Sequence, residues 1–322
     1  MGASLKSYHI AGSGIVLGDR RILNPGRLRW LRSLGWMIGL FALVLVAVGP
    51  GMAVVRHILP TGTPQLAFVA NIISGVLAVG VYALLVRFGE DRHPDELAIK
   101  AAPAQLAAGL GLGAAMFGTV MAILMAFELY TIDWLGSAPA WRAGGHAIQA
   151  ALIEETLVRA ILLRLLWQAF GPVPAFIVSA AVFGVSHIVN PGATVVSVLC
   201  IALEAGIMLG ALYALTGRLW VSIGVHAAWN FTQGYVFGAA VSGGEAGPAL
   251  AHSVARPDVS VLLTGGSFGP EASLPALLVC TGVGVGTLWL AWKRNRFNVE
   301  TGSTMDGRIK SEAAPALAIL NA

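Results

Sequence analysis

The chain has 322 residues, of which 57% are hydrophobic and 11% are charged, and its mean hydropathy is +0.77. A soluble globular domain carries about 25% charged residues, so this composition excludes an ordinary soluble domain and predicts a chain that lies mostly in lipid. The net charge of +4 is small, and no basic stripe with interleaved aromatic residues indicates a nucleic-acid partner.

Eight apolar runs are each about 18 to 25 residues long, which is enough to cross the hydrocarbon core of a membrane. They are residues 34–55, 65–87, 104–128, 145–167, 172–190, 194–215, 219–240 and 273–292. Gly and Ala are frequent in these runs and allow close helix packing in lipid. The predicted fold class is therefore all-α, a polytopic transmembrane helix bundle of about eight spans.

Basic residues predict the orientation of this bundle, because cytoplasmic loops carry an excess of Lys and Arg. Many precede the first span or follow the last one: Lys6, Arg20, Arg21, Arg27, Arg29, Arg32, Lys293, Arg294, Arg296, Arg308 and Lys310. The opposite side receives only Arg56, Arg142 and Arg256. Both termini are therefore predicted to be cytoplasmic, in an integral multi-pass protein of a bacterial-type inner membrane.

Three parts are predicted along the chain. They are a basic cytoplasmic N-terminal segment (1–33), a membrane domain (34–293) and a flexible cytoplasmic tail (294–322). Residues 241–272 are rich in Gly, Ser and Pro and are predicted to form an external loop. We see no internal repeat that relates two halves of the chain.

Charged side chains at membrane depth are costly, so each demands a partner or a function. The stretch "EETLVR" places Glu154 and Glu155 in the fourth span, and Arg159 shares a helix face with Glu155. Glu154 points about 100° away from that face. The arginine can therefore neutralise one carboxylate while the other faces elsewhere. This fits either a structural ion pair between helices or a positioned acid/base beside a neighbour that tunes it.

Two histidines lie in later spans. In "FGVSHIVNP", His187 follows Phe183 by four residues, and Phe183 can wall a pocket; taken alone, such a histidine is more often structural. In "VHAAWN", His226 and Asn230 are four residues apart and share a helix face. Helix rise allows these groups to meet Glu154 at one buried level. Such a pocket suits hydrolysis, because a carboxylate can deprotonate water, imidazoles can hold the water or a metal, and an amide can stabilise an oxyanion.

One further carboxylate, Glu204, lies inside the sixth span. We predict a structural role for it, paired with Arg159 or Arg164, with lining of the substrate path as the alternative. His, His and a carboxylate also make up a familiar catalytic zinc set, although no HExxH motif occurs in the chain.

These segments, in this order, resemble the CAAX protease and bacteriocin-processing (CPBP) family of intramembrane proteases, which is related to the eukaryotic CAAX prenyl endopeptidase. A lone Glu-Glu-x-x-x-Arg is a weak signal, but three motifs in order, each in an apolar span, are specific. The family's motifs Glu-Glu-x-x-x-Arg, Phe-x-x-x-His and His-x-x-x-Asn (or Asp) are matched by Glu154, Glu155 and Arg159, by Phe183 and His187, and by His226 and Asn230. The resemblance covers about residues 145–235, the expected protease core.

The resemblance implies a site open towards the cytoplasm and hydrolysis of peptide bonds in a membrane-associated protein or peptide. The reaction would be CAAX-type processing or bacteriocin and peptide maturation. It also implies that Glu154 activates the water and that Glu155 supports it, together with Arg159. The implied partners are membrane lipid and the membrane-associated substrate, with no nucleic acid.

In the same resemblance, His187 and His226 would hold the water or a metal, and Asn230 would help to stabilise the oxyanion. Both metal-dependent and metal-free glutamate mechanisms are argued for the family. The predicted cofactor is therefore either zinc, held by His187, His226 and Glu154, or none.

Two other functions remain open from the sequence. Intramembrane Glu and His also mark proton relays, which would fit a proton-coupled transporter, but the missing internal repeat argues against one. A catalytically silent immunity or scaffold protein on the same fold is the second alternative. The intact set of Glu154, His187, His226 and Asn230 argues against that.

Overall fold

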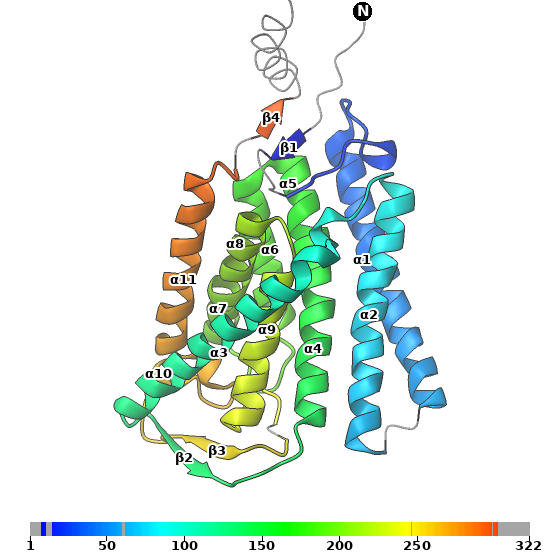
Figure 1. Ribbon diagram of the computed structural model, residues 1–322. Helices are drawn as coiled ribbons and strands as arrows, with labels where there is room; N and C mark the ends of the chain where they lie inside the picture. Colours follow the sequence, from blue (N-terminus) through cyan, green and yellow to red (C-terminus); the bar gives the residue numbers. More distant parts are fainter. Residues whose placement is uncertain (1–7, 11–14, 60–61, 246, 298, 302–322) are drawn as a thin grey trace, which may run out of the picture.

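The computed structural model describes residues 8–10, 15–59, 62–245, 247–297 and 299–301 (Figure 1). The protein is mostly helical, with 72% helix and 5% strand, which confirms the predicted all-α bundle. From position 302 onward, the predicted C-terminal tail lies outside the described residues.

Within the described residues, five helices are long and apolar enough to cross a membrane. They are Arg29–Ile58 (α1), Pro64–Gly89 (α2), Asp95–Ala126 (a short 3-10 start followed by α3, Ala102–Ala126), Val195–Thr216 and Leu274–Lys293 (α11). The fourth of these runs joins α7 (Val195–Ile201), the π-helical segment Ala202–Ile207 and α8 (Met208–Thr216). Five such helices indicate an integral membrane protein.

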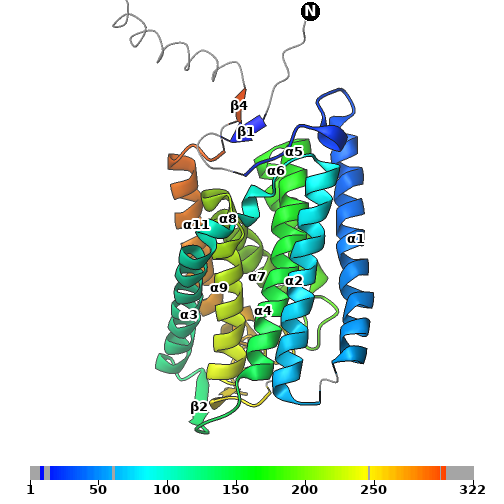
Figure 2. The same ribbon diagram turned by 45° about the vertical axis from the view of Figure 1, so that its right-hand side comes forward.

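Three further helical rods complete the bundle. The first is a continuous helix built from α4 (Trp141–Glu155), the π-helical segment Thr156–Leu163 and α5 (Arg164–Phe170). The others are α6 (Pro172–Ser186) and α9 (Trp220–Phe231), which continues into the π-helical segment Thr232–Val236. The rods lie roughly side by side in both views (Figures 1 and 2).

Each of the eight predicted spans overlaps one of these helices, but the fifth and seventh end earlier than predicted. The structure ends α6 at Ser186. The chain turns at Asn190, Pro191 and Gly192, since the residue before a proline avoids the helical region and Gly192 has a φ of +70°. His187 is therefore the C-cap of α6, not a residue inside a span.

Glycines let α3 approach the helix that carries His226. A Cβ added at Gly109 would lie 2.4 Å from the carbonyl oxygen of Val221, and one at Gly113 would lie 2.4 Å from that of Val225. Only glycine allows the two backbones to pack this closely. The contact holds α9 firmly against the bundle and so fixes the side chains on its other face.

Short strands lie at both ends of the bundle (Figure 1). At one end, β2 (Tyr130–Trp134) pairs antiparallel with β3 (Ala251–Ala255), with Tyr130 opposite Ala255. At the other end, β1 (Tyr8–Ile10) pairs antiparallel with β4 (Val299–Thr301). The predicted loop 241–272 is thus partly regular, since it contributes β3, the short helix α10 (Val261–Thr264) and a 3-10 turn at Pro270–Ala272.

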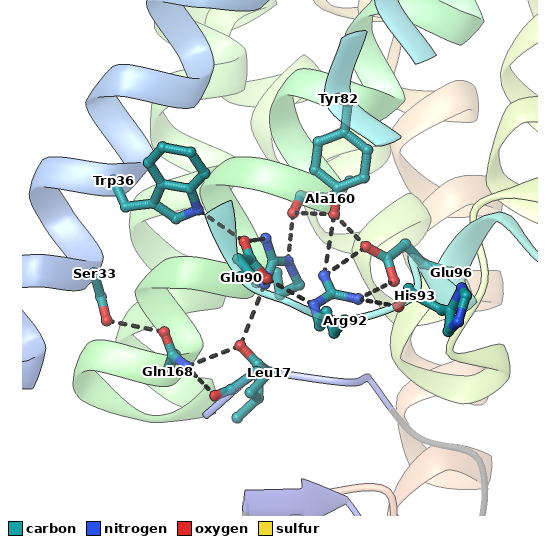
Figure 3. A network of polar contacts seen from close by, with 12 residues as sticks. Leu17, Ser33, Trp36, Tyr82, Glu90, Arg92, His93, Glu96, Ala160 and Gln168 are labelled. Carbon is teal, nitrogen blue, oxygen red and sulfur yellow. Dashed lines mark hydrogen bonds and ion pairs between the residues drawn. The ribbon is translucent and has the colours of Figure 1, made fainter. Parts of the chain in front are cut away.

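A buried network of charges ties α2 to the α4–α5 helix near the β1–β4 end. Arg164 donates from Nη1 and Nη2 to both carboxylate oxygens of Glu90, at 2.9 and 2.6 Å. Arg92 bridges Glu90 and Glu96 at 2.6 and 2.8 Å, and the Tyr82 hydroxyl donates to Glu96 (Figure 3). Both side chains of the Arg164–Glu90 pair are fully buried.

Glu90 lies just after the end of α2, and its ionisation is set by this network. Burial alone would raise the pKa of Glu90. The charges of Arg164 and Arg92 and their hydrogen bonds outweigh the burial and hold its pKa below the ordinary value. The carboxylate therefore stays ionised and anchors both arginines.

Candidate active site

A first cluster of polar side chains in the centre of the bundle joins the α4–α5 helix to α9. Arg159 donates from Nη1 to Glu155 Oε1 at 2.9 Å, which confirms the predicted pair on one helix face. Nδ1 of His226 donates to the same oxygen at 2.9 Å. Glu155 and Arg159 are fully buried, and His226 is 9% exposed. Glu155 is therefore tied to two partners and fixes the orientation of the imidazole.

Glu154 is placed differently from its neighbour. Its side chain is 35% exposed, whereas that of Glu155 is fully buried. Glu154 Oε2 lies 3.8 Å from His226 Nε2, which is too long for a direct hydrogen bond. A reacting group can therefore sit against both atoms.

His187 enters the same region from the end of α6. Its Nδ1 lies 2.8 Å from the carbonyl oxygen of Phe183, and since a carbonyl only accepts, Nδ1 donates. In the neutral ring this leaves Nε2 as an acceptor. The Phe183 ring packs edge-on against His187 and His226, with centroids 5.0 and 6.4 Å away, and the Arg159 guanidinium lies 4.7 Å from its centroid. Phe183 is thus the wall between the polar groups.

The predicted residues meet around three adjoining cavities. A small inner cavity of about 50 Å³ is lined by Phe183, His187, His226 and Asn230, among others. This is room for about one or two water molecules. Glu154 lies outside that inner cavity and borders the two larger ones.

The larger cavities run in two directions from Glu154. One, of about 580 Å³, is lined by Glu154 and Asn230 and by polar residues of the first turns of α4, namely Arg142, His146 and Gln149; we call it the polar cavity. The other, of about 260 Å³, is lined by four polar residues and by apolar residues of α1, the π-helical segment Thr156–Leu163 and α6. The polar ones are Glu154, Ser186, His187 and Asn190, and the apolar ones are Phe41, Leu157, Val158, Val182 and Phe183. Glu154 therefore borders both of the larger cavities.

The predicted zinc set does not fit the geometry as it stands. Among the described residues, no group of three His, Cys, Asp or Glu side chains is placed to hold a metal ion. The hydrogen bond to Glu155 takes only Nδ1 of His226 and leaves Nε2 free, an arrangement that metal-binding histidines share, so it does not argue against zinc. We derive no step that uses a metal, and zinc stays a prediction from the sequence.

Glu204 differs from its prediction. Arg159 pairs with Glu155 and Arg164 pairs with Glu90, so neither predicted partner reaches Glu204. The Glu204 side chain is buried, lines the inner cavity, and leaves Oε1 without a hydrogen-bond partner in the described part of the chain. The alternative prediction, that Glu204 lines the substrate path, stays a prediction; the structure places its side chain in the wall of the inner cavity.

A second carboxylate of the inner cavity, Glu271, was not predicted. It comes from the 3-10 turn before α11 and accepts hydrogen bonds from the backbone N–H and the hydroxyl of Ser242, at 2.6 and 2.8 Å. Burial raises the pKa of Glu271, against these hydrogen bonds, which lower it. Because Glu271 sits in a Gly-rich stretch with no periodic pattern, the sequence offered no signal for it.

The segment that carries these residues also matches a known family. Residues 136–232 match the family model described as type II CAAX prenyl endopeptidase Rce1-like. The chain carries an Rce1-like domain. This domain belongs to the CPBP family that the three motifs indicated, and it supports a CAAX-type intramembrane protease in general.

The Rce1-like segment contains every predicted site residue. It begins between β2 and α4 and ends at the start of the π-helical segment after α9. It therefore leaves α1, α2, α3 and α11 outside the match. Searches of curated proteins and of solved structures gave no match.

Proposed function

We propose that the protein is an intramembrane endopeptidase that hydrolyses a peptide bond of a membrane-associated protein or peptide, with Glu154 as the base. The observation that carries this proposal is the contrast between two adjacent carboxylates. Glu155 is buried and held by Arg159 and His226, while Glu154 is accessible and faces Nε2 of His226 at 3.8 Å. A site that must deprotonate water needs such an uncommitted carboxylate next to fixed partners.

The proposed reaction proceeds in two proton transfers. Glu154 takes a proton from a water molecule, and the water oxygen attacks the carbonyl carbon of the substrate. The protonated Glu154 then gives that proton to the leaving amine, so that the C–N bond breaks and the carboxylate is regenerated.

The other residues of the site position the reacting groups and stabilise the oxyanion. The carboxylate of Glu155 makes Nδ1 of His226 a donor, which aims Nε2 at the reacting groups. His187 Nε2 can accept from the attacking water, because its Nδ1 is committed to the Phe183 carbonyl. The Asn230 amide borders both the inner cavity and the polar cavity, where it can donate to the developing oxyanion.

Cleavage assays with matched carboxamide variants test this proposal. Purified protein is incubated with prenylated CAAX peptides and with a library of membrane-anchored peptides. Glu154→Gln is expected to lose about 10²- to 10⁴-fold in rate, as for a general base. The control Glu128→Gln, which alters a side chain 85% exposed, is expected to cleave like wild type.

Two results would count against the proposal. Full cleavage by Glu154→Gln would remove Glu154 as the base. Absence of cleavage in every variant and with every peptide would favour a proton-coupled carrier or a silent scaffold instead.

Metal analysis of the same samples tests zinc, since a bound zinc that is lost in His187→Ala would support the metal mechanism. The bacterial-type inner membrane stays a prediction.

A further inference from the structure

The loop between α9 and α11 folds back against the turn that follows α6. A Cβ added at Gly243 would lie 1.8 Å from the carbonyl oxygen of Pro191, and one added at Gly192 would lie 2.5 Å from the hydroxyl oxygen of Ser267. Only glycine allows contacts as close as these. The turn at residues 190–192 is therefore in close contact with two separate parts of the loop.

Hydrogen bonds join these two parts of the loop. We call Ser242, Gly243, Ser267 and Phe268 the clasp. The backbone N–H of Gly243 donates to the carbonyl oxygen of Phe268 at 2.7 Å. The Glu271 carboxylate accepts from the N–H and the hydroxyl of Ser242, at 2.6 and 2.8 Å. Ser242 has a φ of +48°, a region that serine rarely adopts. The two bonds to Glu271 therefore stabilise an otherwise unfavourable backbone.

The clasp is anchored to the helix that carries Asn230. Gln233, three residues later and fully buried, donates from its side chain to the carbonyl oxygen of Ala240 at 2.6 Å. The carbonyl of Gln233 accepts from the N–H of Ala239 at 3.0 Å. A Cβ added at Gly269 would lie 2.3 Å from the same oxygen of Ala240. The path of the loop is therefore fixed relative to α9.

The turn after α6 has little other support within the described part of the chain. Ile188, Val189, Pro191 and Gly192 are all exposed. A cavity of about 180 Å³ lies between the start of α7, which follows the turn, and the stretch 261–272 of the loop. Packing alone therefore does not fix the turn, which can shift into free space unless the clasp holds it.

A shift of this turn would move His187. His187 is the C-cap of α6, and its carbonyl accepts from the N–H of Asn190 at 3.1 Å. His187, Glu271 and Asn230 all line the inner cavity. We infer that Glu271 is a positioning residue, which acts through Ser242 and the rest of the clasp to hold His187 beside the catalytic groups of α9. This role rests on the proposed function for its effect on cleavage, but not for the position of the turn.

Two matched pairs of substitutions in the full-length protein test this inference. Glu271→Ala removes the acceptor for Ser242, whereas Glu271→Gln keeps an oxygen that can accept both hydrogen bonds. Gly243→Ala places a Cβ against the carbonyl of Pro191. The control Gly247→Ala makes the same change in the same loop, where an added Cβ meets no atom within 4 Å.

Hydrogen exchange of the backbone amides between residues 187 and 193 reports on the turn without any cleavage. Exchange there is expected to be at least about tenfold faster in Glu271→Ala and Gly243→Ala, with unchanged exchange in α3 and α9. Glu271→Gln and Gly247→Ala should exchange like wild type. In the two loosened variants kcat should fall by about 10²-fold at unchanged KM, as for a misplaced catalytic group, and Glu271→Gln should restore it.

Unchanged exchange in both Glu271→Ala and Gly243→Ala would overturn the inference. So would an unchanged kcat in variants with faster exchange, or a Glu271→Gln variant that fails like Glu271→Ala. If Glu271→Ala does not fold, Gly243→Ala against Gly247→Ala decides. If wild type cleaves no peptide, the proposed function fails, and the exchange alone decides whether Glu271 positions the turn.

Discussion

Two groups of buried charges lie on the same α4–α5 helix, and they are built differently. Around Arg164, both oxygens of Glu90 have hydrogen-bond partners, among them Trp36 and Arg92 (Figure 3). All three guanidinium nitrogens of Arg164 have partners as well. Around Glu155, its Oε2 and the Nε of Arg159 have none among the described residues, and Glu154 stays partly exposed.

The difference shows what each group is for. A saturated cluster stabilises one arrangement of helices, because any lost partner leaves a buried charge unpaired. A cluster with spare atoms beside a cavity can bind and release a reacting group. We therefore expect changes near Arg164 to alter stability and changes near Glu154 to alter catalysis.

The largest effect is expected at Glu155, because this residue contributes both to stability and to catalysis. Glu155→Gln removes the negative charge that pairs with Arg159 and leaves a single amide oxygen to accept from both His226 and Arg159. An orienting carboxylate of this kind is worth up to about 10⁴ in kcat, and an unpaired buried charge costs about 3–5 kcal/mol. Cleavage and chemical unfolding in the same detergent would check both losses; a change in only one of them would contradict the double role.

Arg164→Met should act on stability alone. It leaves Glu90 with only part of its network and is expected to lower the free energy of unfolding by about 3–5 kcal/mol. Cleavage per folded molecule should stay near wild type. The control is the double variant Glu90→Gln/Arg164→Met. Its loss in the free energy of unfolding should be smaller than the sum of the losses of the two single variants, because neither member of the pair is then left as a buried charge without its partner. An additive loss would show that the pair does not couple.

Asn230→Ala should act on catalysis alone. Removing one oxyanion donor costs about 10²- to 10³-fold in kcat, and the unfolding midpoint should not move. Gln149→Ala, which removes another amide from the wall of the polar cavity, is the comparison for a loss of substrate binding and should raise KM without lowering kcat. The same pattern in both variants would place Asn230 in substrate binding and not in oxyanion stabilisation.

The smallest effect is a pH dependence of stability. The pKa of Glu90 is lowered in the folded protein. The stability it contributes is therefore present above the unfolded pKa of about 4.3 and is lost as the pH falls from there through the folded pKa. As the pH falls through that window, the free energy of unfolding of wild type should decrease by up to about 1.4 kcal/mol per pH unit for this one proton. Glu90→Gln should lack this part of the slope, and an unchanged slope would contradict the assignment.

Much of the site was predictable because its chemistry repeats at helical spacing. Glu155 and Arg159, and His226 and Asn230, share faces simply because four residues make about one turn. The spans were predictable from hydropathy, since each helix must cover a similar thickness of lipid.

What could not be predicted depends on contacts between distant segments. Glu90 and Arg164 are 74 residues apart, and nothing local to Arg164 indicates that partner. For the same reason, the prediction that Glu204 pairs with Arg159 or Arg164 was wrong. Glu271 reaches the site only through the fold of the loop after α9, and the π-helical turns have no periodic signature.

The central claim is that Glu154 serves catalysis and Glu90 serves the fold. Glu154→Gln and Glu90→Gln make the same chemical change, so cleavage rate and unfolding midpoint, measured together on both, test it most directly. We predict that Glu154→Gln loses cleavage at an unchanged midpoint, while Glu90→Gln unfolds at a lower temperature and keeps its cleavage per folded molecule. Full cleavage by Glu154→Gln, or a fall in midpoint as large as that of Glu90→Gln, would contradict the claim.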